Sequence, residues 1–156
     1  MKMDSVEFVL KSSFLSCEKD YESILRKLFV DSKKYSDLLK SLLVVNTSDC
    51  LDKLPLYKKD LDKLSPADMI EKGYVRVTPK LSQTEHGEVK SYMILTFDHF
   101  SKNRTNPEFR DCYITIDVLC STDHWELGNY RLRPLKICGY IDAILNEARL
   151  SGIGQL

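Results

Sequence analysis

Two hydrophobic periods divide the chain. Apolar residues recur every three or four positions in the first part of the chain and every second position later. The helical repeat forms two stripes, made of Ile24, Leu25, Leu28 and Phe29, and then of Tyr35, Leu38, Leu39, Leu42 and Leu43. Such stripes are typical of helices that bury one face. We expect Asp20 to cap the first helix and Asp31 or Ser32 to cap the second.

The rest of the first part is expected to be less regular. The stretch between Asn46 and Leu64 is rich in Lys and Asp and contains Pro55, which favours irregular structure anchored by Leu54, Leu56, Leu61 and Leu64. A short helix is predicted to start at Ser65, with Pro66 at its first position, and to end at Gly73. Residues 1–72 are therefore expected to form a helical part.

From residue 74 the period of two indicates strands. We expect strands over 74–78, 88–99 and 111–121, with a turn over 83–87 and a polar connection over 100–110. In the last strand, Cys112, Ile114, Ile116, Val118 and Cys120 alternate with more polar residues, as in a half-buried antiparallel strand. A helix from about Pro134 to Ala148 follows, and Ser151 begins the entry to another strand. The prediction is one α+β domain, 1–156, with N-terminal helices, an antiparallel sheet with a long hairpin, and a C-terminal helix packed on the sheet.

Composition narrows the function classes. At 156 residues, 43% hydrophobic and 29% charged, the chain can bury its own core. Lys plus Arg number 23 and Asp plus Glu number 23, so no cationic excess supports binding to a phosphate backbone. No apolar run reaches the length of a signal peptide or a membrane span, and we expect the protein to stay where it is made.

The cysteines predict no metal centre. The five of them lack any C-x-x-C pair, and Cys120 with His124 has no second pair to complete a zinc site. We expect reduced thiols that are mostly buried. No cofactor fingerprint is present, so neither a metal nor another cofactor is predicted.

Two patterns of carboxylates invite a chemical interpretation. Glu88 and Lys90, with Asp68 about twenty residues earlier, resemble the acids and lysine of a metal-dependent nuclease, but a solvated sheet face is the favoured interpretation. Asp98 and Asp117 lie on neighbouring strands. A turn near Thr105 places Asp98 opposite residues near 112 and Asp117 opposite residues near 93, which is too far apart for a shared-proton pair. No catalytic residue is therefore predicted.

Other residues suggest contact with a partner. Asp123, His124 and Trp125 close the third strand, where Trp125 either covers the core or anchors an interface. The cations Arg131, Arg133 and Lys136 precede or open the last helix, where they oppose its dipole. They are explained either by a solvated loop or by a docking patch for an acidic surface.

The second half also resembles a known group of proteins. The segments 114–120, Arg133-Pro134-Leu135-Lys136-Ile137, 141–146 and Leu150-Ser151-Gly152-Ile153-Gly154 look like those of tail-completion and neck-ring proteins of tailed bacteriophages. The style of the chain is also similar to neck proteins of crAss-like gut phages. The resemblance covers about residues 74–156, and it implies an N-terminal helix, a sheet with one long hairpin, a helix across the sheet, and rings between portal and tail.

The resemblance implies a structural virion protein that acts by assembly. Expected partners are the chain itself, as a six- or twelve-fold ring, and portal or adjacent neck and tail proteins, with DNA only as passing cargo and no membrane. Expected locations are the virion neck and, during assembly, the host cytoplasm. The 100–110 loop and the 83–87 turn would reach neighbouring rings, and the candidate interface residues are Asn103, Arg104, Asn106, Phe109, Trp125, Arg131, Arg133 and Lys136. The alternatives are a small metal-dependent nuclease using Glu88, Lys90 and Asp68 or Asp98, and a monomeric adaptor that binds one protein.

Overall fold

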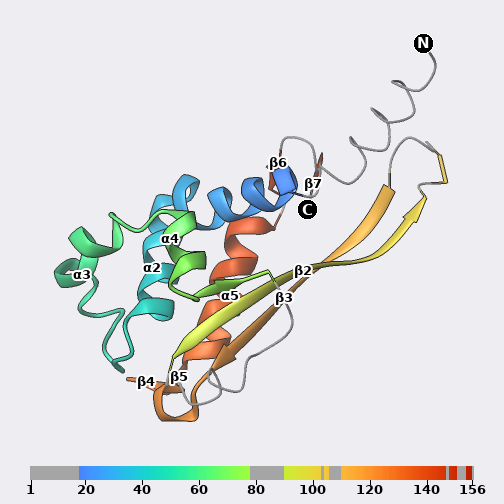
Figure 1. Cartoon of the computed structure of the whole chain (residues 1–156). Coiled ribbons are helices and arrows are strands. Elements are labelled where there is room, and N and C mark those ends of the chain that lie inside the picture. The colour runs from blue at the N-terminus through green and yellow to red at the C-terminus, as the bar shows by residue number, and fades with distance from the viewer. Residues whose placement is uncertain are drawn as a thin grey trace.

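The computed structural model describes residues 18–77, 90–102, 104–105, 110–146, 148–150 and 154–155. It confirms the α+β class, with N-terminal helices, a sheet whose main feature is a long hairpin, and a C-terminal helix after the strands. Helix α5 (Arg133–Leu145) contacts both α2 (Lys33–Val44) and β3 (Arg110–Cys120), so it lies between the first helices and the sheet (Figure 1).

The N-terminal helices follow the apolar stripes, with two differences. Residues 18–26 are α-helical and continue into a π-helical turn, η1 (Lys27–Asp31), so Asp20 lies inside the helix and does not cap it. Ser32 is the N-cap residue of α2, although its side chain makes no capping hydrogen bond. The stretch expected to be irregular contains α3 (Leu54–Leu61), because Pro55 stands in the first turn, where a missing N–H costs nothing. Leu61 is buried there, whereas Leu56 is exposed and anchors nothing.

The short helix α4 (Pro66–Glu71) confirms its predicted start and stop. Ser65 and Asp68 form a reciprocal capping box: the Ser65 side chain accepts from the Asp68 N–H, and the Asp68 carboxylate accepts from the Ser65 N–H at 2.7 Å. Gly73 ends the segment with φ +71°, a left-handed conformation that favours glycine. This turn leads directly into the first strand.

The main sheet is mixed, not wholly antiparallel. Its order is β1-β2-β3, where β1 is Val75–Arg76 and β2 is Ser91–Lys102. The β2–β3 pair is antiparallel as expected, but β1 runs parallel to β2, with Val75 opposite Met93. A parallel pair needs a connection of about a dozen residues or more, and residues 77–90 provide it. The turn expected over 83–87 lies outside the described residues.

The hairpin register agrees with the sequence-based estimate to within one residue. Asp98 pairs with Tyr113, and Asp117 pairs with Ile94, so the two carboxylates are far apart along the hairpin. A bulge that the sequence did not indicate shifts the register beyond Asp98, where His99 has φ 54°. The bulge lies outward of Asp98 and therefore leaves the separation of the two carboxylates unchanged.

The C-terminal part contains two small hairpins around α5. The 3-10 turn η3 (Thr122–His124) leads to β4 (Glu126–Leu127), which pairs antiparallel with β5 (Arg131–Leu132); this hairpin was not predicted from the sequence. Pro134 lies in the first turn of α5, as expected. Beyond α5, β6 (Arg149–Leu150) pairs with β7 (Gly154–Gln155), so the predicted last strand exists within the chain.

One buried cluster joins the two halves of the chain. Its side chains come from the helix over residues 18–31, α2, β2 and α5, and the fully buried members include Ile24, Leu28, Leu39, Leu42, Leu43, Met93 and Ile137. The predicted inner face of β3, from Ile114 to Cys120, packs against this cluster while remaining partly exposed. Helix α5 thus packs on this face of the sheet.

Tyr21 joins the first helix to the hairpin and gives a pH-dependent prediction. Its ring packs at 6.3 Å from that of Phe97, and burial raises the pKa of Tyr21 to about 12, above the ordinary value near 10. The unfolded chain therefore loses this proton first, so the contribution of Tyr21 to stability is present below pH 10 and declines as the pH rises towards 12. We expect the difference in unfolding free energy between the wild type and Tyr21→Phe to fall between pH 8 and pH 11, as measured by urea denaturation. An equal difference at both pH values would contradict this assignment.

Candidate functional site

Arg133 is a buried structural cation. Its side chain is fully buried, and its guanidinium donates to four backbone carbonyls. Nη1 donates to Leu42 O at 2.6 Å and to Val45 O at 2.9 Å, and Nη2 donates to Thr47 O at 2.8 Å. Nε donates to His124 O at 2.7 Å. Arg133 therefore ties the C-terminal end of α2 to the turn before β4 and to the start of α5.

This geometry corrects the expectation that Arg133 presents its charge at the surface. The last carbonyls of a helix have no partner within the helix, and a positive charge is favourable at that end. Arg133 stands at the N-terminus of its own helix α5, where a cation is unfavourable. In the structure the guanidinium donates hydrogen bonds to carbonyls at the C-terminus of α2. Arg133 therefore does not belong to an exposed docking patch.

Lys40 plays a similar part at the end of α3. Its side chain is only 5% exposed, and Nζ donates to Leu64 O at 2.8 Å and to Leu61 O at 3.3 Å. Burial lowers the pKa of Lys40, while nearby Asp37 and Asp62 act in the opposite direction. Lys40 is absent from the residues predicted to be functional, although its position between the apolar residues Leu39 and Leu42 indicates that a cation lies near the buried face of α2.

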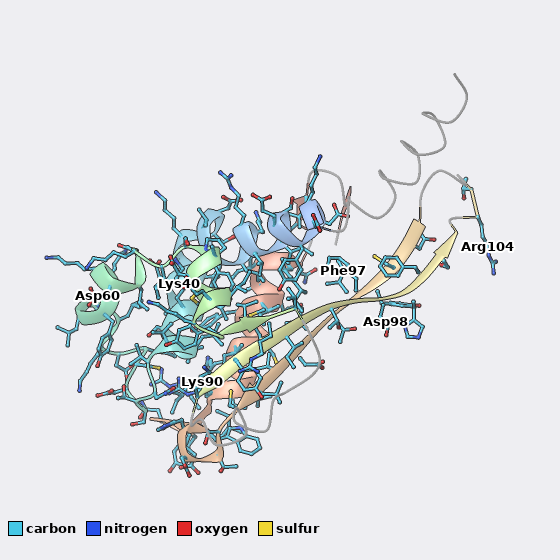
Figure 2. All side chains as sticks on the ribbon, in the orientation of Figure 1. Lys40, Asp60, Lys90, Phe97, Asp98 and Arg104 are labelled. Atoms are coloured by element: carbon cyan, nitrogen blue, oxygen red, sulfur yellow. The ribbon has the colours of Figure 1, made fainter. Side chains whose placement is uncertain are left out.

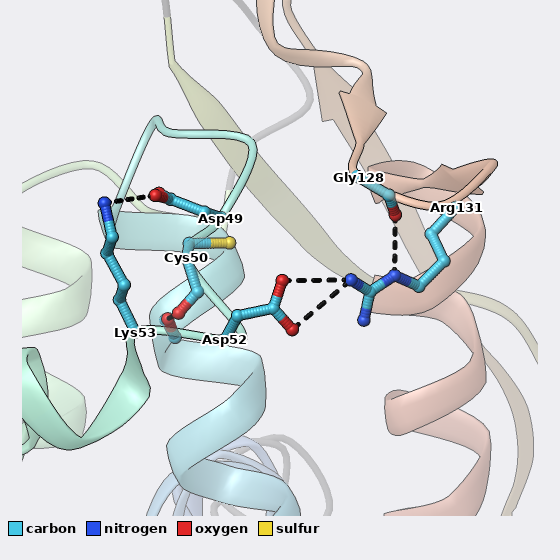
Figure 3. A network of polar contacts seen from close by, with 7 residues as sticks. Asp49, Cys50, Asp52, Lys53, Gly128 and Arg131 are labelled. Carbon is cyan, nitrogen blue, oxygen red and sulfur yellow. Dashed lines mark hydrogen bonds and ion pairs between the residues drawn. The ribbon is translucent and has the colours of Figure 1, made fainter.

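Arg131 is held near the surface by a polar network (Figure 3). Its Nη2 lies 3.2 Å and 3.4 Å from the two carboxylate oxygens of Asp52, and its Nε donates to Gly128 O at 2.8 Å. On the same loop, Asp49 pairs with Lys53. The network fixes the β4–β5 turn to the segment that follows α2. Arg131 keeps about a quarter of its side chain exposed.

Beside this network lies a groove that we call the α5 groove. It has a volume of about 490 Å³ and is bounded by Tyr35 of α2, the β4–β5 turn and the first half of α5. Its exposed apolar wall consists of Tyr130, Leu132 and Leu135, and its cations are Arg131 and Lys136. The predicted interface residues Arg131 and Lys136 therefore lie in one groove. Trp125 is also exposed, but it does not line the groove.

A glycine in the middle of α5 gives a stability prediction. Nothing lies within 4 Å of a Cβ built on Gly139, and the helix gains rigidity from alanine, so Gly139→Ala should raise the unfolding free energy by about 0.5–1 kcal/mol. Gly73→Ala is the opposite control, because its φ is +71° and the Lys90 Nζ lies at 3.2 Å from the added Cβ. Urea denaturation of both variants checks the pair, and a Gly139→Ala protein less stable than the wild type would contradict the prediction.

The second exposed surface is the outer half of the hairpin, which we call the arm: residues 98–102 of β2 and 110–113 of β3. Residues 91–95 are buried, 96–97 are half-buried and 98–101 are exposed, so the core ends where the arm begins. Phe100 is 49% exposed and Tyr113 is 69% exposed. The His99 ring packs edge-on against Tyr113 at 5.5 Å. Figure 2 shows the arm leading away from the helices to Arg104 at its end.

Several predicted interface residues cannot be placed. Arg104 is exposed beyond the end of β2, whereas Asn103, Asn106 and Phe109 lie outside the described residues. Of the cysteines, Cys50 is buried and Cys120 half-buried, but Cys112 and Cys138 are exposed, so the expectation of mostly buried thiols holds only in part. Cys17 lies outside the described residues.

The nuclease-like residues do not converge in the described structure. Asp68 is engaged in the α4 capping box, and Asp98 pairs with its neighbour His99 at 3.2 Å. Lys90 approaches the Lys72 carbonyl at 3.3 Å, and Glu88 lies outside the described residues. Among the described residues, no group of three His, Cys, Asp or Glu side chains is arranged to hold a metal ion. Asp123 and His124 form the η3 turn, where the Asp123 N–H donates to Ser121 Oγ at 3.4 Å.

Within the described part of the chain, every helix is too short or too polar to cross a membrane. No significant match is found among curated proteins or among solved structures. A sequence profile of the YomW family matches residues 36–156, more than three quarters of the chain, from α2 to the C-terminus. This family is associated with phage genes of Bacillus, which is compatible with a phage-encoded protein and assigns no neck or tail-completion role. The chain therefore belongs to the YomW family.

Proposed function

We propose that this chain is a structural protein of a phage virion, one subunit of a ring in the head-to-tail connector, and that it acts by protein–protein assembly. The observation that carries the proposal is the arm, which continues a long hairpin past the end of the hydrophobic core. The phage association of the YomW family supports the phage setting. The resemblance of residues 74–156 to neck-ring and tail-completion proteins supplies the connector role.

The arm is suited to contact with a neighbouring subunit. A two-stranded ribbon with little apolar support is marginally stable in water, and its stability increases when another surface covers it. Phe100 and Tyr113 offer the exposed aromatic groups that dominate many interfaces. In the described sheet β3 is an edge strand, and edge strands are common sites of strand addition.

Repeated head-to-tail contact of this kind generates a ring. A surface that binds a different surface on the next copy closes when the rotation between copies divides a full turn. The proposed partners are therefore further copies of the chain, in a six- or twelve-fold ring, and the portal or adjacent neck and tail proteins. Arg104, at the end of the arm, would face such a neighbour. A balanced charge of 23 cations and 23 anions suits a channel through which DNA only passes.

Native mass spectrometry of the purified full chain tests this proposal, first alone and then mixed with particle lysate from its source. The proposal predicts a six- or twelve-fold ring, or capture into a complex of portal size. A strict monomer under both conditions would contradict it and favour the monomeric adaptor. Mg²⁺-dependent DNA cleavage lost in Glu88→Ala would instead support the nuclease alternative.

A further inference from the structure

The α5 groove combines three features that the fold itself does not need. Its wall is apolar and exposed, with Tyr130 fully exposed and Leu135 67% exposed. Single exposed apolar residues are common, but a contiguous set around a groove marks an interaction site more often. The groove is distinct from the arm, so a ligand of the groove does not depend on ring formation.

The turn that presents Tyr130 is strained. Asn129 and Tyr130 have φ values of 63° and 59°, both in the left-handed region. Asn tolerates this region, but for a bulky aromatic residue it is unusual and unfavourable. Tyr130 gains no burial in return, since its side chain is fully exposed. These conformations close the tight β4–β5 turn, but the turn does not require an aromatic side chain, and here it presents the Tyr130 ring beside the groove.

The floor of the groove contains Gly139. A glycine in the middle of a helix weakens that helix, yet no neighbouring atom excludes a side chain at this position. The missing side chain leaves the α5 backbone accessible from the groove. The absence of a side chain at Gly139 would allow a ligand to pack closely against the backbone of α5.

The charge of the groove indicates the chemistry of its occupant. Arg131 and Lys136 line the groove, and among the residues that the structure describes no carboxylate lines it. Asp52, outside the lining, holds Arg131 in an ion pair, so the cationic character of the groove rests mainly on Lys136. Cations beside aromatic and aliphatic walls favour carboxylates that stand next to apolar side chains.

We propose that the α5 groove binds a segment of a partner protein that carries Asp or Glu next to a large apolar side chain. The apolar side chain packs between Tyr130 and Leu135 over Gly139, and the carboxylates approach Lys136 and the exposed part of Arg131. The Tyr35 and Tyr140 rings, 6.0 Å apart, close the α2 side of the site.

A random dodecapeptide display library panned on the full chain provides the probe. The recovered peptides are synthesised with a fluorophore and titrated by fluorescence anisotropy. We expect enriched sequences with Asp or Glu beside Leu, Phe or Trp. Gly139→Trp, which fills the groove, and Lys136→Glu, which reverses its charge, should each weaken binding by about tenfold or more. Lys59→Glu on α3 is the matched charge control and should leave binding unchanged.

Gly139→Ala keeps the result interpretable if Gly139→Trp folds poorly. It favours the helix and should still weaken binding, by about threefold, because it narrows the floor of the groove. The proposal is overturned if panning returns no enriched sequence or only basic ones, or if the peptides bind the Gly139 and Lys136 variants as they bind the wild type. It is also overturned if sedimentation shows that the chain self-associates and that Gly139→Trp abolishes this, because the occupant is then a second copy.

Discussion

Arg133→Met lowers the free energy of unfolding by about 3–5 kcal/mol, the largest effect that we expect of any single substitution in this chain. Met keeps an unbranched apolar stem like that of Arg but lacks the guanidinium, so it leaves the carbonyls of Leu42, Val45, Thr47 and His124 without their donor. The bond to the Leu42 carbonyl is buried, and an acceptor there that loses its donor costs on the order of 1–3 kcal/mol. The other three bonds are partly buried, so water replaces part of what they lose. Since small domains are stable by about 5–15 kcal/mol, the variant should unfold at markedly lower urea concentration.

Arg131→Met is the matched control. Arg131 is two residues away and forms an ion pair that is open to solvent, with a more exposed Asp52. Such pairs contribute about 1 kcal/mol or less. Urea denaturation followed by circular dichroism compares the two variants. If Arg131→Met is as destabilising as Arg133→Met, the buried guanidinium is not the connection that holds α2, the β4 turn and α5 together.

The combined substitution of Phe100→Ser and Tyr113→Ser abolishes assembly while leaving the monomer folded. Both rings are largely exposed on the arm, so the core loses little when they are removed. Exposed aromatic groups at the centre of an interface each contribute about 2 kcal/mol or more to binding, and losing two should weaken association by at least about a hundredfold. Native mass spectrometry and incorporation into particles measure the loss, and circular dichroism confirms the fold.

Leu56→Ser is the control for the arm variant. Leu56 is 73% exposed on α3, so this substitution removes a similar exposed apolar group from another face. Assembly of Leu56→Ser should match the wild type. Normal incorporation of the arm variant, or equal loss in Leu56→Ser, would contradict a specific role of the arm.

The spacing of apolar residues along the sequence predicted most of the architecture, because this spacing reflects which side chains are buried. The stripes at Ile24–Phe29 and Leu39–Leu43 are buried, and the alternation from Ile114 to Cys120 matches a strand with one face on the core. The hairpin register followed from the position of its turn. Helix α3 is not expected from the sequence because proline is unfavourable in most helical positions, although it is tolerated in the first turn, where Pro55 lies.

The spacing of apolar residues predicts the functional surfaces less well. The parallel pairing of β1 depends on how a long connection returns, which no local pattern encodes. Arg133 donates hydrogen bonds to carbonyls about ninety residues earlier in the chain. Its role could therefore not be derived from the residues next to it in the sequence. The turn before β5 contains Gly128 and Asn129, which are usual turn residues, but nothing in the sequence indicates that Tyr130 also adopts a positive φ. Arg131 and Lys136 were recognised as a cluster, but the groove that contains them depends on Tyr35 of α2.

The most direct test of assembly through the arm is site-specific photo-crosslinking in particles. A benzophenone side chain replaces Tyr113 on the arm or, as the control, Leu56 on α3, which has nearly the same exposure. The proposal predicts that particles irradiated with the Tyr113 probe yield covalent products joining this chain to another copy or to a neck or tail protein, whereas the Leu56 probe yields few. Equal yields from both positions, or no product from Tyr113 in particles that contain the chain, would contradict it.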